Sequence, residues 1–377
     1  MNTLVLKFGG SSFRDPSDYR KVAAHLAERQ KMSDDKIVVV VSAMAGATDK
    51  LKDSVLNINK EASPSNLDAA LATGEMLSSC FLEAALSRLG ISAMSLNGYS
   101  LGIRTDSGFG RASVKRTDPR TILSELQSND VVVAAGAQGV DECGKISFLG
   151  RNSSDLTAVI IAAMLNADTC EIYSDVPGVY TADPHLIPGA QLIPELSYLT
   201  VTKMSRHGAK VLHHKAVDYA ERHRIRVVCK SLTSNGAIEG TIVTHRGCGR
   251  SVTVARDAAV LAFSSSMERD SFRRLLDRHD VSTISLEDPG KSKICLIDDL
   301  EFAMQLCARG GEHLPQSIAS QTVVAELNSS EFRVHLESDY DRAISLARQI
   351  HDRMFPGAAT EPLGLSKKSS AQSTTHG

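Results

Sequence analysis

Tryptophan is absent from this 377-residue sequence, and aromatic residues make up only 5% of it. Proteins that bind single-stranded nucleic acid stack the bases on aromatic side chains. The formal net charge is −2, so the chain also lacks the positive excess that attracts nucleic acid or an anionic membrane. We therefore expect no nucleic-acid and no membrane partner, and any cation that binds phosphate must act locally.

Closely spaced cysteine pairs are absent too. The seven cysteines are scattered, odd in number and without a C-x-x-C pair. This pattern favours neither disulfides nor a zinc site, so we expect free thiols, a reducing cytoplasm and no metal held by protein side chains. The amino-terminal run resembles a strand rather than a signal peptide, and no apolar stretch is expected to span a bilayer. These features predict a cytoplasmic protein.

Short β-branched runs alternate with segments of helical periodicity through the first 250 residues. Such alternation predicts an α/β fold, and consecutive apolar strands indicate a three-layer α/β/α arrangement around a mainly parallel sheet. We expect this domain over residues 1–248. The predicted strands are 4–8, 37–42, 131–135, 170–174 and 226–230, and the main predicted helices begin near Asp15 or span 65–89, 156–165 and 200–223.

The segment 240–250 is expected to hold the last strand of this domain and then turns polar and glycine-rich, which indicates a boundary near residue 248. A string of shorter elements follows. Their order predicts a smaller α+β, ferredoxin-like domain over residues 249–356. The segment 357–377 is rich in Ser, Thr, Gly and Lys, and we expect it to be disordered. The predicted strands are 251–265, 281–286, 293–297, 322–327 and 332–337, with helices at 269–280 and 341–354.

The first predicted strand leads into Lys7 and two adjacent glycines. Because glycine has no Cβ, the backbone N–H groups of Gly9 and Gly10 can approach an anion closely. We interpret Lys7 as a phosphate-binding cation, although an ordinary solvated turn accounts for the same residues. Two further loops, 42–46 and 174–184, follow predicted parallel strands, so all three loops are expected to meet at one edge of the sheet.

Arg151 precedes a predicted helix that begins at Ser154 and Asp155. Arginine can hold a carboxylate through two parallel hydrogen bonds, whereas an aspartate can hold an ammonium group, and a zwitterionic amino acid needs both. A capped helix beside a surface arginine is the structural alternative. Gly74 and Glu75 interrupt a helical run, and this carboxylate is either solvated or a second partner for an ammonium group.

Lys210 falls in a predicted helix of small and apolar residues. Its ammonium group either reaches out of the core to solvent or serves as a second phosphate-binding cation beside Lys7.

Seven segments occur in the order and at the spacing found in aspartokinases of the amino-acid kinase superfamily, and this chain resembles that family over roughly its first 250 residues. The part beyond it resembles the family's ACT regulatory region only in outline. The segments are Lys7-Phe-Gly-Gly-Ser-Ser12, Val41-Ser-Ala43, Gly74-Glu75, Gly102-Ile-Arg-Thr-Asp-Ser-Gly-Phe-Gly110, Gly150-Arg151 with Ser154-Asp155, Asp175-Val-Pro-Gly-Val-Tyr180 and Gly208-Ala-Lys-Val-Leu-His213.

This resemblance implies transfer of the γ-phosphoryl group of ATP, with Mg²⁺, to the side-chain carboxylate of L-aspartate. A carboxylate is already ionised at neutral pH, so the reaction needs no general base, and its main obstacle is repulsion between two anions. The family's roles carry over residue by residue. Lys7 and Asp155 are expected to be catalytic; Gly9, Gly10, Ser11 and Ser42 to bind phosphate; Ser174, Asp175, Tyr180 and Lys210 to bind the nucleotide; and Thr48, Glu75, Arg151 and Ser154 to bind the substrate.

Three departures from the family pattern fall inside the expected site. Asn152 and Ser153 replace two glycines that usually follow the substrate arginine, Ala137 replaces an aromatic residue, and His185 replaces an arginine. Weaker binding of ATP or a different acceptor would follow. We also find no Pro-Gly loop where ACT domains usually present one to an effector, although Asp288-Pro-Gly290 lies elsewhere, so feedback inhibition by lysine or threonine is not predicted.

Three hypotheses therefore remain open at this stage. The first is an active aspartokinase in a specialised pathway without the usual feedback control. The second is a kinase for another amino-acid or related carboxylate, and the third is a catalytically silent protein that binds a nucleotide or amino acid. The family tends to pair through its tail domains, and we expect a homodimer.

Overall fold

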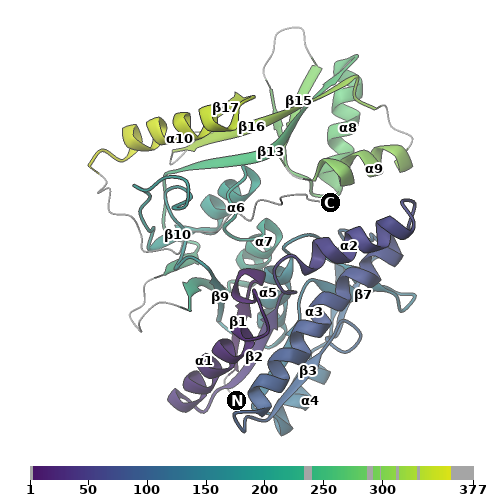
Figure 1. Ribbon diagram of the computed structural model, residues 1–377, viewed down its shortest axis with the longest axis vertical. Coiled ribbons are helices and arrows are strands. Elements are labelled where there is room, and N and C mark those ends of the chain that lie inside the picture. Colours follow the sequence, from purple (N-terminus) through teal and green to yellow (C-terminus); the bar gives the residue numbers. More distant parts are fainter. Residues whose placement is uncertain are drawn as a thin grey trace, which may run out of the picture.

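The computed structural model describes residues 3–232, 240–286, 292–297, 299–310, 314–328 and 332–357. Figure 1 shows a large lower part built around one sheet and a smaller upper part, residues 251–357, built around a second sheet. We call this smaller part the C-terminal region. The predicted disorder beyond residue 357 and the segment Asp288-Pro-Gly290 lie outside the described residues.

The large sheet has eight strands and is parallel except where β11 meets β12. This confirms the predicted mainly parallel sheet, and its five central strands are the five that the sequence predicted. The three additional strands are short and lie toward the edges. One of them, β12, falls in the segment 240–250 where a last strand was predicted, whereas β3 and β10 were not predicted. In spatial order the strands are β10 (Glu195–Ser197), β12 (Thr241–Thr244), β11 (Arg226–Ser231), β9 (Thr169–Ser174), β1 (Thr3–Phe8), β2 (Lys36–Val41), β6 (Val131–Ala135) and β3 (Ala93–Leu96).

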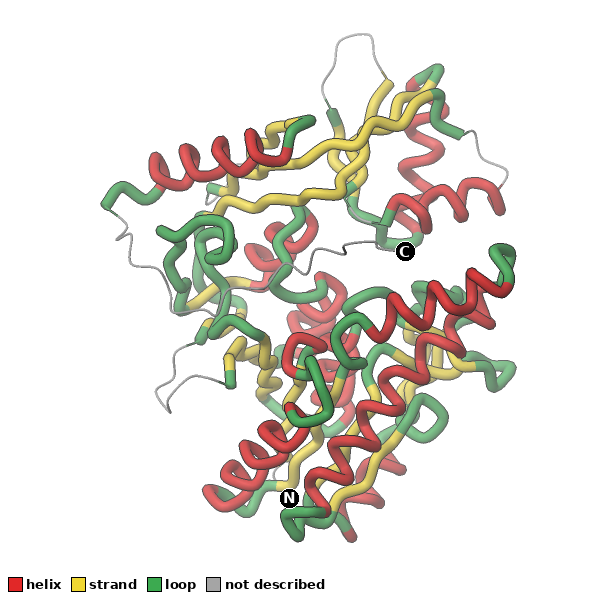
Figure 2. Tube along the Cα trace, viewed as in Figure 1, coloured by secondary structure: helices red, strands yellow, loops and turns green. Residues whose placement is uncertain are grey.

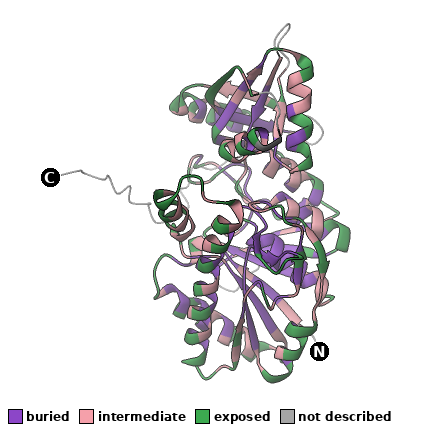
Figure 3. Ribbon diagram, turned by 90° about the vertical axis from the view of Figure 1, so that its right-hand side faces the viewer, coloured by how far each residue is buried: buried purple, intermediate pink, exposed green. Residues whose placement is uncertain are grey.

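Helices cover both faces of this sheet, which confirms the three-layer prediction (Figure 2). Alternate residues of β1 point to opposite layers: Val5 belongs to the apolar cluster that includes α4, α5 and α7, whereas Leu6 and Phe8 belong to the cluster that includes α1 and α3. As a result, β6 is buried along its whole length and β2 is buried at every residue after Lys36 (Figure 3). The helices of this part are α1 (Asp18–Met32), α2 (Ala47–Ile58), α3 (Pro64–Ser87), α4 (Arg120–Ser128), α5 (Ser154–Met164), α6 (Tyr198–Arg206) and α7 (His214–His223), with a short 3₁₀ helix, η1, at Gly10–Ser12.

Helix α3 corrects two expectations. First, the helix runs without a break through Gly74. A Cβ at that position would lie 3.0 Å from the Cβ of Ala43, so glycine is present because it lets the helix approach the loop after β2. Second, the helix is long and apolar enough to pass as a membrane-spanning helix, with a mean hydropathy of 1.2, although 44% of that apolar window is buried inside the protein. Its apolar residues pack against β2, β3 and β6.

The predicted helix over residues 200–223 is two helices. Gly208 adopts a φ of +93°, and a Cβ there would lie 2.4 Å from the Cβ of Ala255 in the C-terminal region. The chain therefore leaves the helix after Arg206 and resumes it at His214. Lys210 lies in the intervening loop and is exposed, so its placement within a helix was wrong.

Two further sheets complete the structure. A four-stranded sheet beside β6 contains β4 (Ile103–Thr105), β5 (Val114–Thr117), β7 (Gln138–Val140) and β8 (Ile146–Phe148). The C-terminal region has an antiparallel sheet in the order β14 (Thr283–Ser285), β15 (Ser292–Leu296), β13 (Ser251–Phe263), β16 (Ser317–Leu327) and β17 (Phe332–Glu337), with helices α8 (Ser266–Arg278), α9 (Leu300–Gly310) and α10 (Tyr340–Met354). Its α+β composition agrees with the prediction, except that α9 was not predicted.

Glu171 of β9 forms a buried ion-pair network that joins α1 to the large sheet. Its carboxylate accepts hydrogen bonds from both terminal nitrogens of Arg29, at 2.9 and 3.2 Å, and from Lys230 Nζ at 2.8 Å. The Tyr173 hydroxyl donates a further bond at 2.9 Å. Burial opposes ionisation of Glu171, but the bonds from Arg29 and Lys230 outweigh it and lower the pKa of this carboxyl below its usual 4.5.

Glu171→Gln is therefore expected to lower the free energy of unfolding at pH 7 by about 3 kcal/mol, because two partly buried cations lose their partner. The lowered pKa in the folded state means that this stabilisation is present above the unfolded pKa and is lost as the pH falls below about 4.5. Urea denaturation at pH 7 and at acid pH measures both effects. Glu28→Gln, at an exposed position of α1, is the control. Equal stability of Glu171→Gln and the unmodified protein at pH 7 would contradict the prediction.

Candidate active site

The three loops predicted to converge do lie side by side. Strands β9, β1 and β2 are parallel neighbours, so their carboxyl ends share one edge of the sheet. The Gly9 N–H donates a hydrogen bond to the Tyr173 carbonyl at 3.3 Å, and the Ser42 N–H donates to the Phe8 carbonyl at 3.1 Å. These bonds place the Gly-Gly turn between the loop after β2 and the loop after β9.

Lys7 and Asp155 form an ion pair at the centre of this edge. The Lys7 Nζ lies 2.7 Å from Asp155 Oδ1, and the two side chains are only 12% and 9% exposed. The other oxygen of Asp155 accepts a hydrogen bond from the His213 backbone N–H at 3.2 Å. A Cβ on Gly9 would lie 3.2 Å from Lys7 Nζ, so the glycine keeps the space beside the amine open.

Serine hydroxyls and the amino end of α5 surround the ion pair. Ser42 Oγ donates to Ser154 Oγ at 3.0 Å, and Ser78 Oγ donates to the Ser42 carbonyl at 2.7 Å. Ser154 is the first residue of α5, whose free N–H groups and helix dipole favour an anion at this end. Gly136 closes the back of the site, since a Cβ there would lie 2.7 Å from Ser154 Oγ. Ser11 lies nearby in η1 and is exposed.

Glu75, on α3, lies next to Ala43 in the loop after β2. The residue is 4% exposed, and its Oε2 has no hydrogen-bond partner among the described residues. Burial raises the pKa of this carboxyl to about 7, although a hydrogen bond with the Ala43 backbone opposes the rise. A buried carboxylate oxygen without a partner is costly, and a bound ammonium group would satisfy it.

Arg151 lies at the outer side of the site. Its Nη2 is 3.3 Å from Asp49 Oδ1, and the two side chains are 66% and 68% exposed. So exposed a pair contributes little to stability, which leaves the guanidinium group available to a ligand carboxylate. Thr48, beside Asp49 in the first turn of α2, is half-buried.

Two of the residues that depart from the family pattern have left-handed backbone conformations. Asn152 has a φ of +58° and Ala137 a φ of +61°. Asparagine tolerates this conformation well, so Asn152 maintains a turn for which glycine is the usual choice. Ala137 is held by a hydrogen bond from its N–H to Thr157 Oγ1 at 2.9 Å and by one from the Leu149 N–H to its carbonyl at 2.8 Å. The second bond helps to hold the chain that leads to Arg151.

Asp68 of α3 supports this side of the site and was missed by the sequence analysis. Its Oδ2 accepts hydrogen bonds from the backbone N–H groups of Gly110, at 2.9 Å, and Phe148, at 2.7 Å. Burial raises the pKa of this carboxyl to about 6, against the effect of these two bonds. Asp68 thus ties the loop that contains Gly110 to the chain that leads to Arg151. An acidic residue on the buried side of a predicted helix was the available signal.

The residues expected to bind the nucleotide differ in exposure. Asp175 is exposed, whereas Ser174 donates its hydroxyl hydrogen bond to the Val176 carbonyl at 2.9 Å within its own turn. Tyr180 is only 7% exposed and packs in an apolar cluster with α10. Lys210 belongs to the loop whose His213 N–H reaches Asp155, so this loop extends to the central ion pair.

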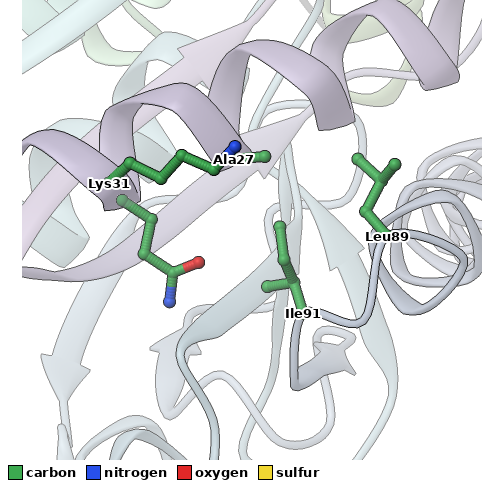
Figure 4. A pocket seen from close by; sticks show the side chains of 5 residues that line it. Ala27, Lys31, Leu89 and Ile91 are labelled. Atoms are coloured by element: carbon green, nitrogen blue, oxygen red, sulfur yellow. The ribbon is translucent and has the colours of Figure 1, made fainter.

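A shallow depression elsewhere on the large domain contains none of the expected site residues (Figure 4). It lies between α1 and the turn after α3, and is lined by Ala27, Gln30, Lys31, Leu89 and Ile91.

Residues 2–231 match the model of the amino acid kinase family. The match covers more than half of the chain, and the chain belongs to this family. Among solved structures, aspartokinase III of E. coli in complex with aspartate and ADP has a TM-score of 0.67 at 23% identity, over 87% of each chain. This similarity agrees with the three-layer fold and the smaller α+β region.

Several members of the family with sequence similarity to this chain are named aspartokinases or aspartate kinases. The aspartokinase of Bacillus sp. (strain MGA3) is 39% identical over 271 residues, which is 71% of this chain and 64% of that protein. Aspartokinase 2 of Bacillus subtilis (strain 168) is 36% identical over 259 residues, 69% of this chain and 63% of that one. The aspartate kinase from Synechocystis has a TM-score of 0.58 at 29% identity, over 87% of this chain and 60% of its own. The chain thus spans a little under two thirds of the length of these curated relatives.

Proposed function

We propose that this chain is an aspartate kinase, which transfers the γ-phosphoryl group of ATP to the side-chain carboxylate of L-aspartate. The observation that carries the proposal is the nearly buried Lys7–Asp155 ion pair at the amino end of α5, with the unpartnered carboxylate oxygen of Glu75 facing the same loop region. The similarity to proteins named aspartokinase supports this choice within the family.

The reaction forms a bond between an aspartate Oδ and the γ-phosphorus, and it breaks the bond between that phosphorus and the oxygen bridging the β- and γ-phosphates. ADP leaves with the electron pair of the broken bond, and no proton needs to be removed from the ionised acceptor. The task is to neutralise charge and to align two anions. Lys7 supplies a cation, while the N–H groups of Gly10 and of the amino end of α5 supply neutral donors. The Gly9 N–H is already bonded to the Tyr173 carbonyl, so Gly9 contributes the open space beside Lys7 rather than the donor expected from the sequence.

The acceptor needs one cationic and one anionic partner. Arg151 would bind its α-carboxylate, and Glu75 would bind its ammonium group, with Thr48 and Ser154 adding hydroxyl contacts. Asp155 orders the site by holding Lys7 and the His213 backbone at once. Binding of the ammonium would place a cation next to the unpartnered oxygen of Glu75 and favour its ionised form.

ATP would enter as its Mg²⁺ complex, with the metal as part of the substrate. Mg²⁺ is commonly held by phosphate oxygens and water with one or two carboxylates, and the described residues contain no group of three or more His, Cys, Asp or Glu side chains that could hold a metal. Lys210 would bind phosphate from the loop between α6 and α7, beside Ser11 and Ser42. Ser174, Asp175 and Tyr180 would form the nucleotide loop after β9.

We further propose that residues 249–356 form an ACT-like regulatory domain and that the protein is a cytoplasmic homodimer. The order of strands and helices in the C-terminal region supports the first part, because its sheet is antiparallel with helices packed against it. Light scattering tests the second part, and a monomer at micromolar concentration would contradict it.

Trapping the product with hydroxylamine tests the proposed reaction. With Mg-ATP and L-aspartate we expect aspartyl hydroxamate, because an acyl phosphate reacts readily with this nucleophile. L-Glutamate, D-aspartate and succinate serve as alternative acceptors, and Lys7→Ala serves as the inactive control. A hydroxamate from another acceptor alone would replace aspartate as the substrate. No hydroxamate despite measurable ATP binding would reject kinase activity.

A further inference from the structure

Asp280, in the turn after α8, joins the C-terminal region to both ends of the loop that contains Lys210. Its Oδ1 lies 3.0 Å from Nη2 of Arg206, the last residue of α6. Its Oδ2 lies 2.8 Å from Nε2 of His214, the first residue of α7, and 3.9 Å from Lys215 Nζ. One carboxylate therefore holds the two helix ends between which residues 207–213 run.

The backbone of Asp280 is suited to this role. The residue has a φ of +54°, a left-handed conformation that aspartate and asparagine tolerate better than most side chains. Its own carbonyl accepts a hydrogen bond from Arg111 Nη1 at 3.5 Å. Burial disfavours the charged carboxylate, but the bond from His214 and the nearby cations outweigh it and lower the pKa of Asp280 to about 2. Asp280 is consequently ionised throughout the physiological range.

The C-terminal region also packs against the loop itself. Thr253 Oγ1 of β13 donates a hydrogen bond to the His207 carbonyl at 2.6 Å, and the Phe332 ring of β17 contacts the His207 ring. A Cβ at Gly208 would lie 2.4 Å from the Cβ of Ala255, so only glycine allows this approach. These contacts hold the start of the loop, at His207 and Gly208, against the C-terminal region.

The opposite end of the same loop reaches the reaction centre. The His213 N–H donates to Asp155 Oδ2, and Asp155 in turn holds Lys7. His213 and His214 are stacked, with ring centroids 4.9 Å apart, so the residue bound by Asp280 packs directly on the residue bound by Asp155. Lys210 lies between the part of the loop held by β13 and the part held by Asp155.

We propose that Asp280 is a positioning residue for the nucleotide site: it fixes the loop 207–213 so that the Lys210 ammonium group and the His213 N–H meet the bound triphosphate and Asp155. This inference rests on the proposed function, because it assigns Lys210 to the nucleotide. It makes the C-terminal region part of the machinery that holds ATP, independently of any effector.

The test compares Asp280→Asn with the unmodified full-length protein. Asparagine keeps the shape and tolerates the backbone conformation but removes the charge that holds Arg206 and Lys215. We expect KM for ATP to rise by about tenfold while KM for the acceptor changes by less than about twofold, because the acceptor contacts lie on other elements. Hydrogen exchange of the backbone amides of residues 208–214 should become faster. Asp277→Asn, near the end of α8 and paired among the described residues with Arg273 alone, at 3.9 Å, is the matched control.

Hydrogen exchange tests the positioning role of Asp280 separately from the proposed kinase function, since the measurement needs no catalysis. Faster exchange in residues 208–214 with no change in ATP affinity would show that Asp280 holds this loop, but it would overturn the role of Asp280 in the nucleotide site. Unchanged exchange and unchanged KM would overturn the proposal as a whole. Absence of ATP binding by the unmodified protein would reject the proposed function, and with it the assignment of Lys210. His214→Phe retains a ring but removes the donor to Asp280, and should reproduce the rise in KM for ATP if Asp280→Asn fails to fold.

Discussion

Replacing Lys7 with alanine is expected to reduce the rate of ADP formation by at least about a thousandfold while the affinity for ATP changes by no more than about tenfold. The reason is that Lys7 lies between the Gly-Gly turn and the amino end of α5, where charge would develop on the transferred phosphoryl group in the proposed reaction. Binding of the ground-state nucleotide would still use Lys210 and backbone donors. Initial rates at saturating Mg-ATP and aspartate, with ATP affinity from calorimetry, measure the two quantities separately.

Lys7→Ala also leaves the carboxylate of Asp155 buried without its cation, which is expected to destabilise the fold. The double variant Lys7→Ala with Asp155→Asn removes that unpaired charge and should recover stability without recovering turnover. Lys36→Ala, at the start of β2 with a partly exposed partner in Asp130, controls for the loss of a strand lysine. Near-normal turnover of a folded Lys7→Ala protein would reject the catalytic role.

Glu75→Gln is expected to lower kcat/KM for L-aspartate by about a hundredfold at pH 8, because the residue proposed to bind the substrate ammonium group would lose its buried charge. The pKa of the Glu75 carboxyl is about 7, so in the unmodified protein kcat/KM should rise as the pH increases through 7 and this carboxyl ionises. The variant should lack that rise. Steady-state rates across pH 6 to 9 with varied aspartate provide the comparison.

The free energy of unfolding should change with pH in the direction opposite to kcat/KM. The pKa of Glu75 is higher in the folded protein than its usual 4.5, so ionisation weakens the fold as the pH rises from about 4.5 to 7. Glu75→Gln is therefore expected to raise the free energy of unfolding at pH 8. Glu83→Gln is the control on the same helix, where the carboxylate accepts a bond from the Ser95 N–H at 2.8 Å. An unchanged KM for aspartate would remove Glu75 from the acceptor site.

Much of the fold was predictable because its signals are local. Among the five central strands, β6 and all of β2 after Lys36 are continuous apolar runs, and a parallel sheet buries them on both faces. Failures occurred where a neighbour in space outweighs local periodicity. Gly74 was expected to interrupt a helix, but it lies inside one, where its missing side chain allows close packing against Ala43. The helix expected over residues 200–223 is broken at Gly208, which packs against Ala255.

The site shows the same division. Lys7, Gly9, Glu75 and Arg151 were predicted as site residues from their residue types and from the resemblance to aspartokinases. The supporting carboxylates of Asp68 and Asp280 were not identified, since the first is an acid on an apolar helix and the second follows a short helix in the C-terminal region. Asp68 binds backbone N–H groups and Asp280 binds side chains at the two ends of a loop, and these partners are distant in sequence. Pairings of this kind produce no periodic pattern in the sequence.

The amino-acid sequence by itself determined the chemical groups available and the layering of the fold. A glycine pair after a lysine permits close approach to an anion, and apolar strands between helices require a covered parallel sheet. Only the tertiary structure decided the pairings: Asp155 with Lys7, Asp49 with Arg151, and Asp280 with both ends of the loop that contains Lys210. The physical reason is that backbone preferences act over a few residues, whereas the distance between two charges depends on how whole helices and strands pack.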